Sequence, residues 1–172
     1  MRRLLLICTG VALLFLPAAA AEAGAGARTG WLVVRAAANN GGVVGSPVAT
    51  VVVRGFVLGR IADQGSIEIY QLGASSSAQP QVTGPDVSRR GVRWRGVSGS
   101  KWTGTGFRFR AVGGVFRLVV RGSGVYLFAG GRGNVTLQGS TDSPAHDGSY
   151  AVDGGRFRSL PSHPVRRSLG KS

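Results

Sequence analysis

Residues 107–121 read FRFRAVGGVFRLVVR, and this stretch decides the fold class of the chain. Apolar and basic residues alternate on both sides of the Gly113-Gly114 pair, which is typical of strands with one buried and one exposed face. A two-residue glycine link favours a tight turn between neighbouring strands. We therefore predict an antiparallel hairpin formed by Phe107–Val112 and Val115–Arg121.

If the two glycines form the turn, Val112 pairs with Val115, and the partners of the other hairpin residues follow. The apolar face then contains three pairs: Phe107 with Val120, Phe109 with Leu118, and Ala111 with Phe116. The opposite face carries Arg108, Arg110, Arg117 and Arg121, with Arg110 directly across from Arg117. Like charges in that arrangement destabilise a sheet, unless their heads splay into solvent or hold an anion between them.

The segment Val92-Arg93-Trp94-Arg95 repeats the alternation and places its two arginines opposite the valine and the tryptophan. We therefore predict a basic sheet face. We hypothesise that this face contacts an anionic polymer through Arg93, Arg95, Arg108, Arg110, Arg117 and Arg121. The alternative is a face whose arginines are simply solvated.

The remaining sequence predicts one all-β domain over residues 31–155. The chain contains 29 glycines, and these bound short runs of Val, Phe, Trp and Tyr, which favour strands. We expect strands at Trp31–Ala37, Val48–Ile61, Gly65–Leu72, Gly91–Val97 and Ser149–Val152, and further strands up to Gln138. Gly55 and Gly59 predict a bulge or break within the second of these strands. Gly73–Arg90 is predicted to be a long surface loop. The predicted fold is an antiparallel meander in a single sandwich or barrel, and the alternative is a β-solenoid.

The first 23 residues predict a cleaved signal peptide. Arg2 and Arg3 precede a 13-residue apolar run, Leu4–Leu16, whereas a spanning helix needs about 20 residues. Ala21-Glu22-Ala23 then supplies a small-x-small cleavage pattern. An uncleaved anchor is the alternative. We expect a flexible leader at residues 24–30 and a basic, disordered tail at residues 156–172.

The chain has a formal net charge of +14, and only two of its 21 basic residues are lysines. A charge of this size attracts polyanions through forces that salt weakens, although an arginine bias is also what a G+C-rich genome produces. The expected partners are an anionic cell-envelope polymer or a lipid surface. We expect no specific nucleic acid, no transmembrane anchor after cleavage and no cofactor.

The sequence contains no recognisable catalytic motif. The single cysteine, Cys8, lies in the signal peptide, so thiol catalysis and cysteine-ligated metals are excluded from the mature chain. The only local acid–base cluster is His146-Asp147 with Asp142, and His163 lies between prolines in the tail. We predict a non-enzymatic domain. The alternatives are a hydrolase that uses His146 with a nearby carboxylate, and a module that self-associates through an exposed strand edge.

Turn and strand motifs recur from about Phe107 to Pro161, in GGVFRLVVRGSGVYL and DGSYAVDGGRFRSLP. In these motifs the chain resembles uncharacterised secreted Gly/Arg-rich β-proteins of actinobacteria. The resemblance implies a secreted, β-rich protein. It implies no activity and transfers no functional residue.

Overall fold

A computed structural model describes residues 28–37, 47–73, 79–139 and 147–170. The predicted signal peptide, most of the predicted leader, and the candidate site residues Asp142 and His146 lie outside these ranges. In the part of the chain that is described, all regular secondary structure is β, and every strand pair is antiparallel. The prediction of an all-β antiparallel fold is therefore confirmed.

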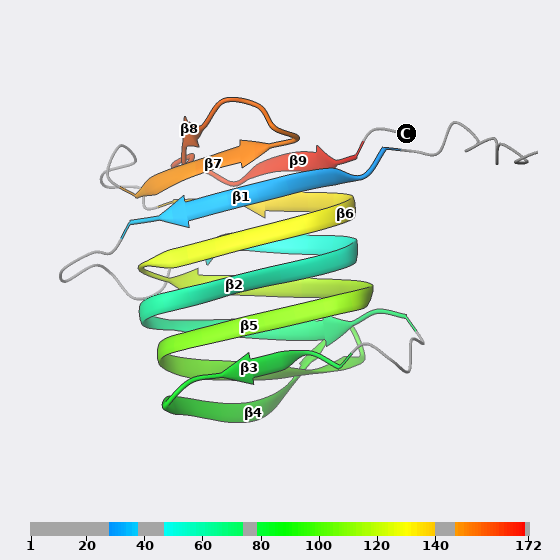
Figure 1. The fold of residues 1–172 in the computed structure, drawn as a ribbon. Helices are drawn as coiled ribbons and strands as arrows, with labels where there is room; N and C mark the ends of the chain where they lie inside the picture. The colour runs from blue at the N-terminus through cyan, green and yellow to red at the C-terminus, as the bar shows by residue number, and fades with distance from the viewer. Residues whose placement is uncertain (1–27, 38–46, 74–78, 140–146, 171–172) are drawn as a thin grey trace, which may run out of the picture.

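The described chain forms one sheet of nine strands in the order β3-β5-β2-β6-β1-β7-β8, with β4 paired to β5 and β9 paired to β6. The sheet is not closed into a barrel. Strands stack as rungs along the molecule, with β3 and β4 at one end and β7 to β9 at the other (Figure 1). Their bounds are β1 (Gly30–Ala36), β2 (Pro47–Gln71), β3 (Gln81–Thr83), β4 (Asp86–Trp94), β5 (Val97–Gly122), β6 (Val125–Leu137), β7 (Gly148–Val152), β8 (Arg158–Ser159) and β9 (Val165–Leu169).

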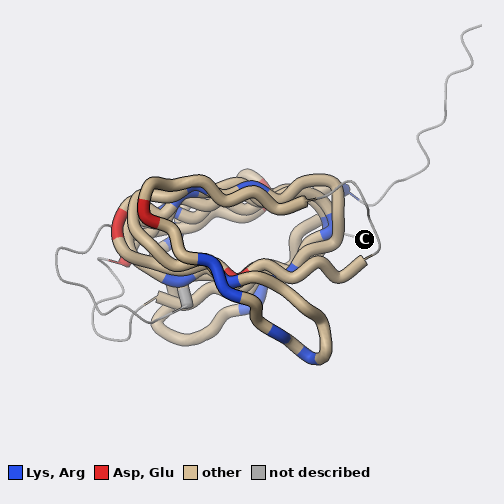
Figure 2. The backbone as a smooth tube through the Cα atoms, turned by 90° about the horizontal axis from the view of Figure 1, so that it is seen from below, with Lys and Arg blue, Asp and Glu red and all other residues tan. Residues whose placement is uncertain are grey.

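Strands β2, β5 and β6 are long enough to bend and pass from one layer of the molecule to the other. Viewed along the stack, the chain outlines a flattened ring with two facing layers (Figure 2). The front layer contains β1, β3 and residues 56–61, 107–112 and 125–130; the back layer contains β4, β9 and residues 47–54, 65–71, 99–105, 115–121 and 132–137. Neighbouring rungs run antiparallel.

Glycines allow the strands to bend at the two edges of the ring. At one corner, four paired glycines form a row across four strand segments: Gly30, Gly131, Gly55 and Gly114. The φ angles of Gly55 and Gly131 are +153° and +140°, where residues with a Cβ are strained. The predicted bulge at Gly55 is confirmed, since the register of β2 against β5 shifts there. The second corner has a similar row: Gly104, Gly65 and Gly122.

The predicted hairpin at Gly113-Gly114 is wrong. Strand β5 continues through both glycines, and the two segments that were expected to pair lie in different layers, where each pairs with β2. Phe107 pairs with Ile61, Arg110 with Leu58, and Leu118 with both Val51 and Ile69. Arg117 pairs with Val52 and Tyr70 and is therefore not across from Arg110. The tight two-residue turn forms instead at Arg95-Gly96, with φ angles of +47° and +81°, between β4 and β5.

The long-range pairing wins because it gives β5 more partners than a local hairpin. Residues 116–121 of β5 pair with β2 along both edges. In the predicted hairpin, one edge of this segment would pair with residues 107–112 and would lose its pairing with β2. Both arrangements bury the same alternate side chains. Phe107, Phe109, Ala111, Phe116, Leu118 and Val120 are all buried in the core, as their alternation predicts.

The predicted disordered tail is wrong over most of its length. Residues 158–159 form β8 and pair with β7, and residues 165–169 form β9 and pair with β6. Leu160 and Leu169 are each 1% exposed, so these two leucines hold an otherwise basic segment against the core. The predicted loop at residues 73–90 is likewise too long, because β3 and β4 begin at Gln81 and Asp86.

Candidate functional site

The structure distributes the six arginines of the predicted basic face over both layers. Arg108 and Arg110 lie on the outside of the front layer, next to residues 58–60 of β2. The other four lie in or beside the back layer: Arg117 and Arg121 in β5, Arg93 in β4, and Arg95 in the turn that follows β4. Basic positions are accordingly visible on both layers of the ring (Figure 2). The prediction of one shared basic face is wrong, because β5 crosses from one layer to the other.

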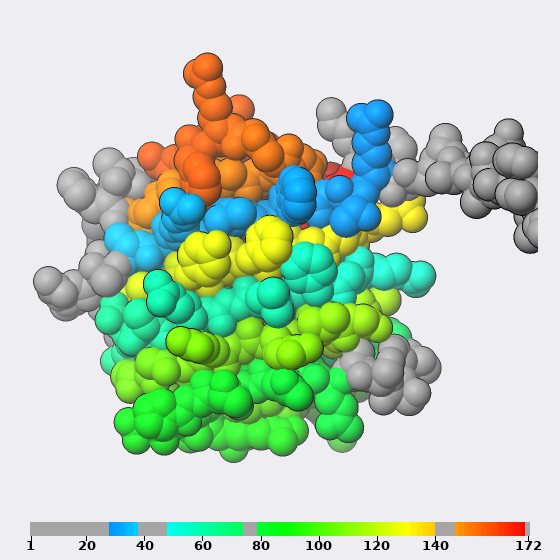
Figure 3. All heavy atoms as spheres, viewed as in Figure 1, coloured from blue at the N-terminus to red at the C-terminus, as the bar shows by residue number. Residues whose placement is uncertain are grey.

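The outer surface of the front layer is the first candidate site. Strand register aligns its outward side chains in three adjacent rows. One row contains Arg35, Tyr126, Arg60 and Arg108; the next contains Val33, Phe128, Leu58 and Arg110; and the third contains Trp31, Gly130, Phe56 and Val112. We call these rows the aromatic–arginine face. Figure 3 looks onto this side of the molecule, where β1, β6, β2 and β5 follow one another in bands.

Large apolar side chains are exposed on this face. Trp31, Tyr126 and Leu58 are 56%, 40% and 38% exposed. The ring of Phe128 lies between those of Trp31 and Phe56, with centroid separations of 6.5 Å and 5.4 Å. The rings are tilted by 35° and 58°, so they form an uneven apolar strip and not a flat stacking platform.

A shallow hollow of about 430 Å³ lies where the apolar and basic rows meet. It is lined by Leu58, Gly59, Arg60, Arg108, Tyr126 and Phe128. The hollow therefore combines two guanidinium groups with aromatic and aliphatic walls. That combination suits a ligand with an anionic head beside an apolar group.

The arginines of this face carry unopposed charge. Arg60 and Arg108 are directly opposite each other on neighbouring strands, and none of the three rows contains a carboxylate. Within the described ranges, neither Arg60, Arg108 nor Arg110 forms an ion pair. Arg35 stacks on the ring of Phe157, 4.7 Å from its centroid, which extends the aromatic surface at the β1 end.

Trp31 is held in place by its backbone. Its N–H donates to Asp153 Oδ1 at 2.9 Å, and its carbonyl accepts a hydrogen bond of 2.8 Å from the Asp153 N–H. Asp153 is one of two non-glycine residues with positive φ in the described chain, at +51°. This clamp fixes the start of β1 and holds the exposed indole at the edge of the face.

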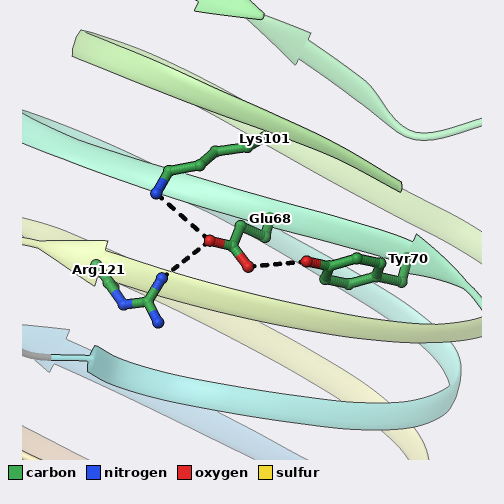
Figure 4. A network of polar contacts seen from close by, with 4 residues as sticks. All are labelled: Glu68, Tyr70, Lys101 and Arg121. Carbon is green, nitrogen blue, oxygen red and sulfur yellow. Dashed lines mark hydrogen bonds and ion pairs between the residues drawn. The ribbon is translucent and has the colours of Figure 1, made fainter. Parts of the chain in front are cut away.

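The outer surface of the back layer is arranged differently, around one carboxylate. Glu68 Oε1 lies 3.0 Å from Arg121 Nη1 and 3.4 Å from Lys101 Nζ. The hydroxyl of Tyr70 donates to Glu68 Oε2 at 3.0 Å. These four residues, from β2 and both halves of β5, form the Glu68 cluster (Figure 4).

Opposing effects set the protonation of this cluster. Partial burial raises the pKa of Glu68, but the Tyr70 hydrogen bond and the positive charges of Arg121 and Lys101 outweigh burial. The net result is a pKa below the ordinary value of 4.5. Burial, followed by the bond to Glu68, raises the pKa of Tyr70 above 10.0. At neutral pH the carboxylate is therefore ionised, and the phenol keeps the proton that it donates.

Arg117 and Arg95 also have intramolecular partners on the back layer. The Arg117 guanidinium lies 4.5 Å from the Trp94 ring centroid and 5.3 Å from that of Tyr70. Arg95 lies 5.3 Å from the same Trp94 ring. Burial lowers the pKa of Arg117, although a guanidinium stays protonated at neutral pH. Trp94 therefore packs against Arg117 and Tyr70 and is not part of the buried core.

Sequence reasoning missed Trp31, Arg35, Leu58, Arg60 and Tyr126 as members of a candidate face. Each stands at an outward position of a period-two alternation, so the local signal was present. The sequence does not reveal the strand register that aligns residues of β1, β6 and β2 in the same rows. The predicted hairpin also paired β5 with itself and thereby hid its partner β2.

The described residues hold no group of three or more His, Cys, Asp and Glu side chains that could bind a metal ion. In the same part of the chain, no helix has the length and apolar character needed to span a bilayer. The hydrolase alternative uses His146 with a nearby carboxylate, and His146 lies outside the described ranges. The geometry of the described surface thus offers contacts to anions and apolar groups.

Comparisons with known proteins found no protein-family model, no curated protein and no solved structure that matches this chain.

Proposed function

We propose that this chain is an exported, non-enzymatic domain that adsorbs to an anionic lipid surface through its aromatic–arginine face. The observation that carries the proposal is the position of Arg60, Arg108 and Arg110 beside exposed Leu58 and the aromatic strip. These three arginines form no ion pair among the described residues. Arginines near an anionic membrane contribute about 1 kcal/mol each. Tryptophan and tyrosine side chains favour the membrane–water interface.

Exposed aliphatic side chains favour a lipid surface over a soluble anionic polymer. Leu58 and Val112 are 38% and 41% exposed, and a hydrated polyanion offers these side chains no apolar phase to enter. A headgroup layer accepts both the guanidinium heads and the apolar side chains beside them. Export is supported by the signal peptide predicted in residues 1–23.

The test is co-sedimentation with vesicles of phosphatidylglycerol in phosphatidylcholine, using the chain without residues 1–23 so that the signal segment does not insert. Replacing Arg60, Arg108 and Arg110 with Gln should weaken binding about tenfold or more. The matched control replaces Arg156, Arg166 and Arg167, which are equally exposed but lie outside this face. Equal losses in the two triple variants would refute a specific face.

A second measurement separates lipid from polymer. Trp31→Ala and Leu58→Gln should weaken vesicle binding severalfold and leave retention on polyglutamate unchanged, since polyglutamate is anionic but has no apolar phase. Binding of the unchanged chain to polyglutamate, with no preference for anionic over neutral vesicles, would favour an envelope polymer as the partner and overturn the lipid proposal.

A further inference from the structure

The back layer contains a second hollow, about 540 Å³ in volume, at the corner where Gly104, Gly65 and Gly122 lie side by side. Its lining is polar and basic, in contrast to the aromatic–arginine face. Serine and threonine hydroxyls from β2, β4 and β5 line it together with basic side chains from β4 and β5. We call it the corner hollow.

The hydroxyl groups are brought together by strand register. Ser88 of β4 pairs with Thr103, Thr103 pairs with Ser66, and Ser66 also pairs with Arg121. Paired residues on neighbouring strands point to the same side of a sheet, so these four side chains form one outward row. Ser88 Oγ donates to the Thr103 carbonyl at 3.2 Å, which fixes the edge of the row.

A charged row lies next to the hydroxyl row. Arg90 pairs with Lys101, and Lys101 pairs with Glu68. Glu68 Oε1 lies within 3.0 Å of Arg121 Nη1 and 3.4 Å of Lys101 Nζ, so one carboxylate positions two of the cations at the rim. Arg90, Lys101 and Arg121 thus provide three positive charges against one negative charge.

We propose that the corner hollow binds a phosphoryl group. A tetrahedral oxyanion accepts hydrogen bonds from several directions, which matches donors spread over two rows and three strands, whereas a carboxylate has two oxygens in one plane. Guanidinium and ammonium groups with hydroxyls are the donors that proteins use for phosphate. The hollow lies on the opposite layer from the aromatic–arginine face, so its occupancy does not depend on that face.

The experiment is calorimetric titration of the full chain with inorganic phosphate and with glycerol 3-phosphate at low ionic strength. Arg90→Gln should weaken binding about tenfold, since it removes a charge-assisted contact. Thr103→Val keeps the branched shape of a strand residue and should weaken binding severalfold. The matched controls are Arg110→Gln on the front layer and Thr136→Val at the far end of the back layer, which should change affinity less than twofold.

Unchanged melting temperatures confirm that each variant keeps its fold. Absence of heat for both phosphates at about 10 mM with the unchanged chain, or equal losses in test and control variants, would overturn the proposal. Because Arg90 and Thr103 lie outside the aromatic–arginine face, loss of phosphate binding with intact vesicle binding in Arg90→Gln and Thr103→Val separates this site from the proposed lipid-binding function.

Two sources of the phosphoryl group are distinguished by further titrations. If the group belongs to a lipid headgroup, monomeric dihexanoyl phosphatidylglycerol should bind more tightly than glycerol 3-phosphate, and Arg90→Gln should remove that binding. If it belongs to a soluble polymer, poly(glycerol phosphate) should bind more tightly than the monomer, with the same sensitivity to Arg90→Gln. Either result supports a phosphoryl site, and insensitivity of both ligands to Arg90→Gln refutes it.

Discussion

The two outer faces of this molecule use arginine in different ways. On the front layer, Arg60, Arg108 and Arg110 lie beside exposed apolar side chains and form no ion pair with any residue that the structure describes. On the back layer, Arg121 is bound to Glu68, and Arg117 lies against Trp94 and Tyr70. The second set makes contacts within the fold, and we expect the first set to contribute little to stability. Arginine content alone therefore does not identify a binding surface, because the partners of each guanidinium decide its role.

The largest expected effect comes from the glycine corner that separates the two faces. Gly131→Ala would place a Cβ against the Arg54 carbonyl oxygen and 2.9 Å from Val53 Cγ2, at a φ of +140°. We expect the free energy of unfolding to fall by about 3 kcal/mol or more, measured by urea denaturation. The control is Gly91→Ala, whose Cβ would meet nothing within 4 Å. A similar loss in both variants would mean that the corner conformation is not the cause.

A smaller effect compares single arginines from the two faces. Arg117→Ala removes contacts with two aromatic rings and the packing of the aliphatic stem, and it should lower the free energy of unfolding by about 1–2 kcal/mol. Arg110→Ala should change it by about 0.5 kcal/mol or less. Thermal and chemical denaturation of the two variants measure the difference. If both substitutions cost the same, the distinction between the two sets of arginines fails.

The pH dependence of stability tests the Glu68 cluster. Because the folded-state pKa of Glu68 lies below 4.5, its contribution is fully present above the unfolded value and is lost as the pH falls through the folded value. Glu68→Gln should therefore lower the melting temperature at pH 7 and flatten its decline below pH 4.5. If the melting temperatures of the variant and the unchanged chain fall equally steeply with pH in this acid range, this role of Glu68 is contradicted.

The smallest effect has the opposite sign. Arg60 and Arg108 are directly opposed on the front layer, and such a pair destabilises a sheet by a few tenths of a kcal/mol. Arg60→Gln should therefore stabilise the fold slightly at low salt. The gain should disappear at about 1 M salt, where the Debye length is about 3 Å. A loss of stability at low salt would show that Arg60 supports the fold and is not free for binding.

The sequence predicted the fold class and much of the burial, since alternation is a local property. The alternate apolar residues on both sides of Gly113-Gly114 are buried as predicted: Phe107, Phe109, Ala111, Phe116, Leu118 and Val120. The strands at Trp31–Ala37 and Ser149–Val152 are also confirmed to within one residue at each end. The predicted hairpin was wrong because Gly113-Gly114 has the composition of a tight turn. Nothing in the neighbouring sequence indicates that the segments on either side of these glycines pair with β2 and not with each other.

The candidate faces were harder to predict than the core. Burial requires only that a residue points inward, whereas a binding face requires the register of several strands at once. Arg35, Arg60 and Arg108 share a row only because β6 lies between β1 and β2. The prediction for the tail was wrong for another reason: its buried apolar residues among those described are Leu160 and Leu169, and two leucines in a basic segment give little periodic signal for the strands β8 and β9.

The strand order, in which β1 lies between β6 and β7, also affects how fast the chain can fold. β1 pairs with β6 about a hundred residues further along the chain, so the front layer cannot be completed until β6 is available. Folds dominated by such distant contacts take milliseconds to seconds to form. A chain that completes its sheet late stays unfolded for longer, which is compatible with the proposed export across a membrane before folding.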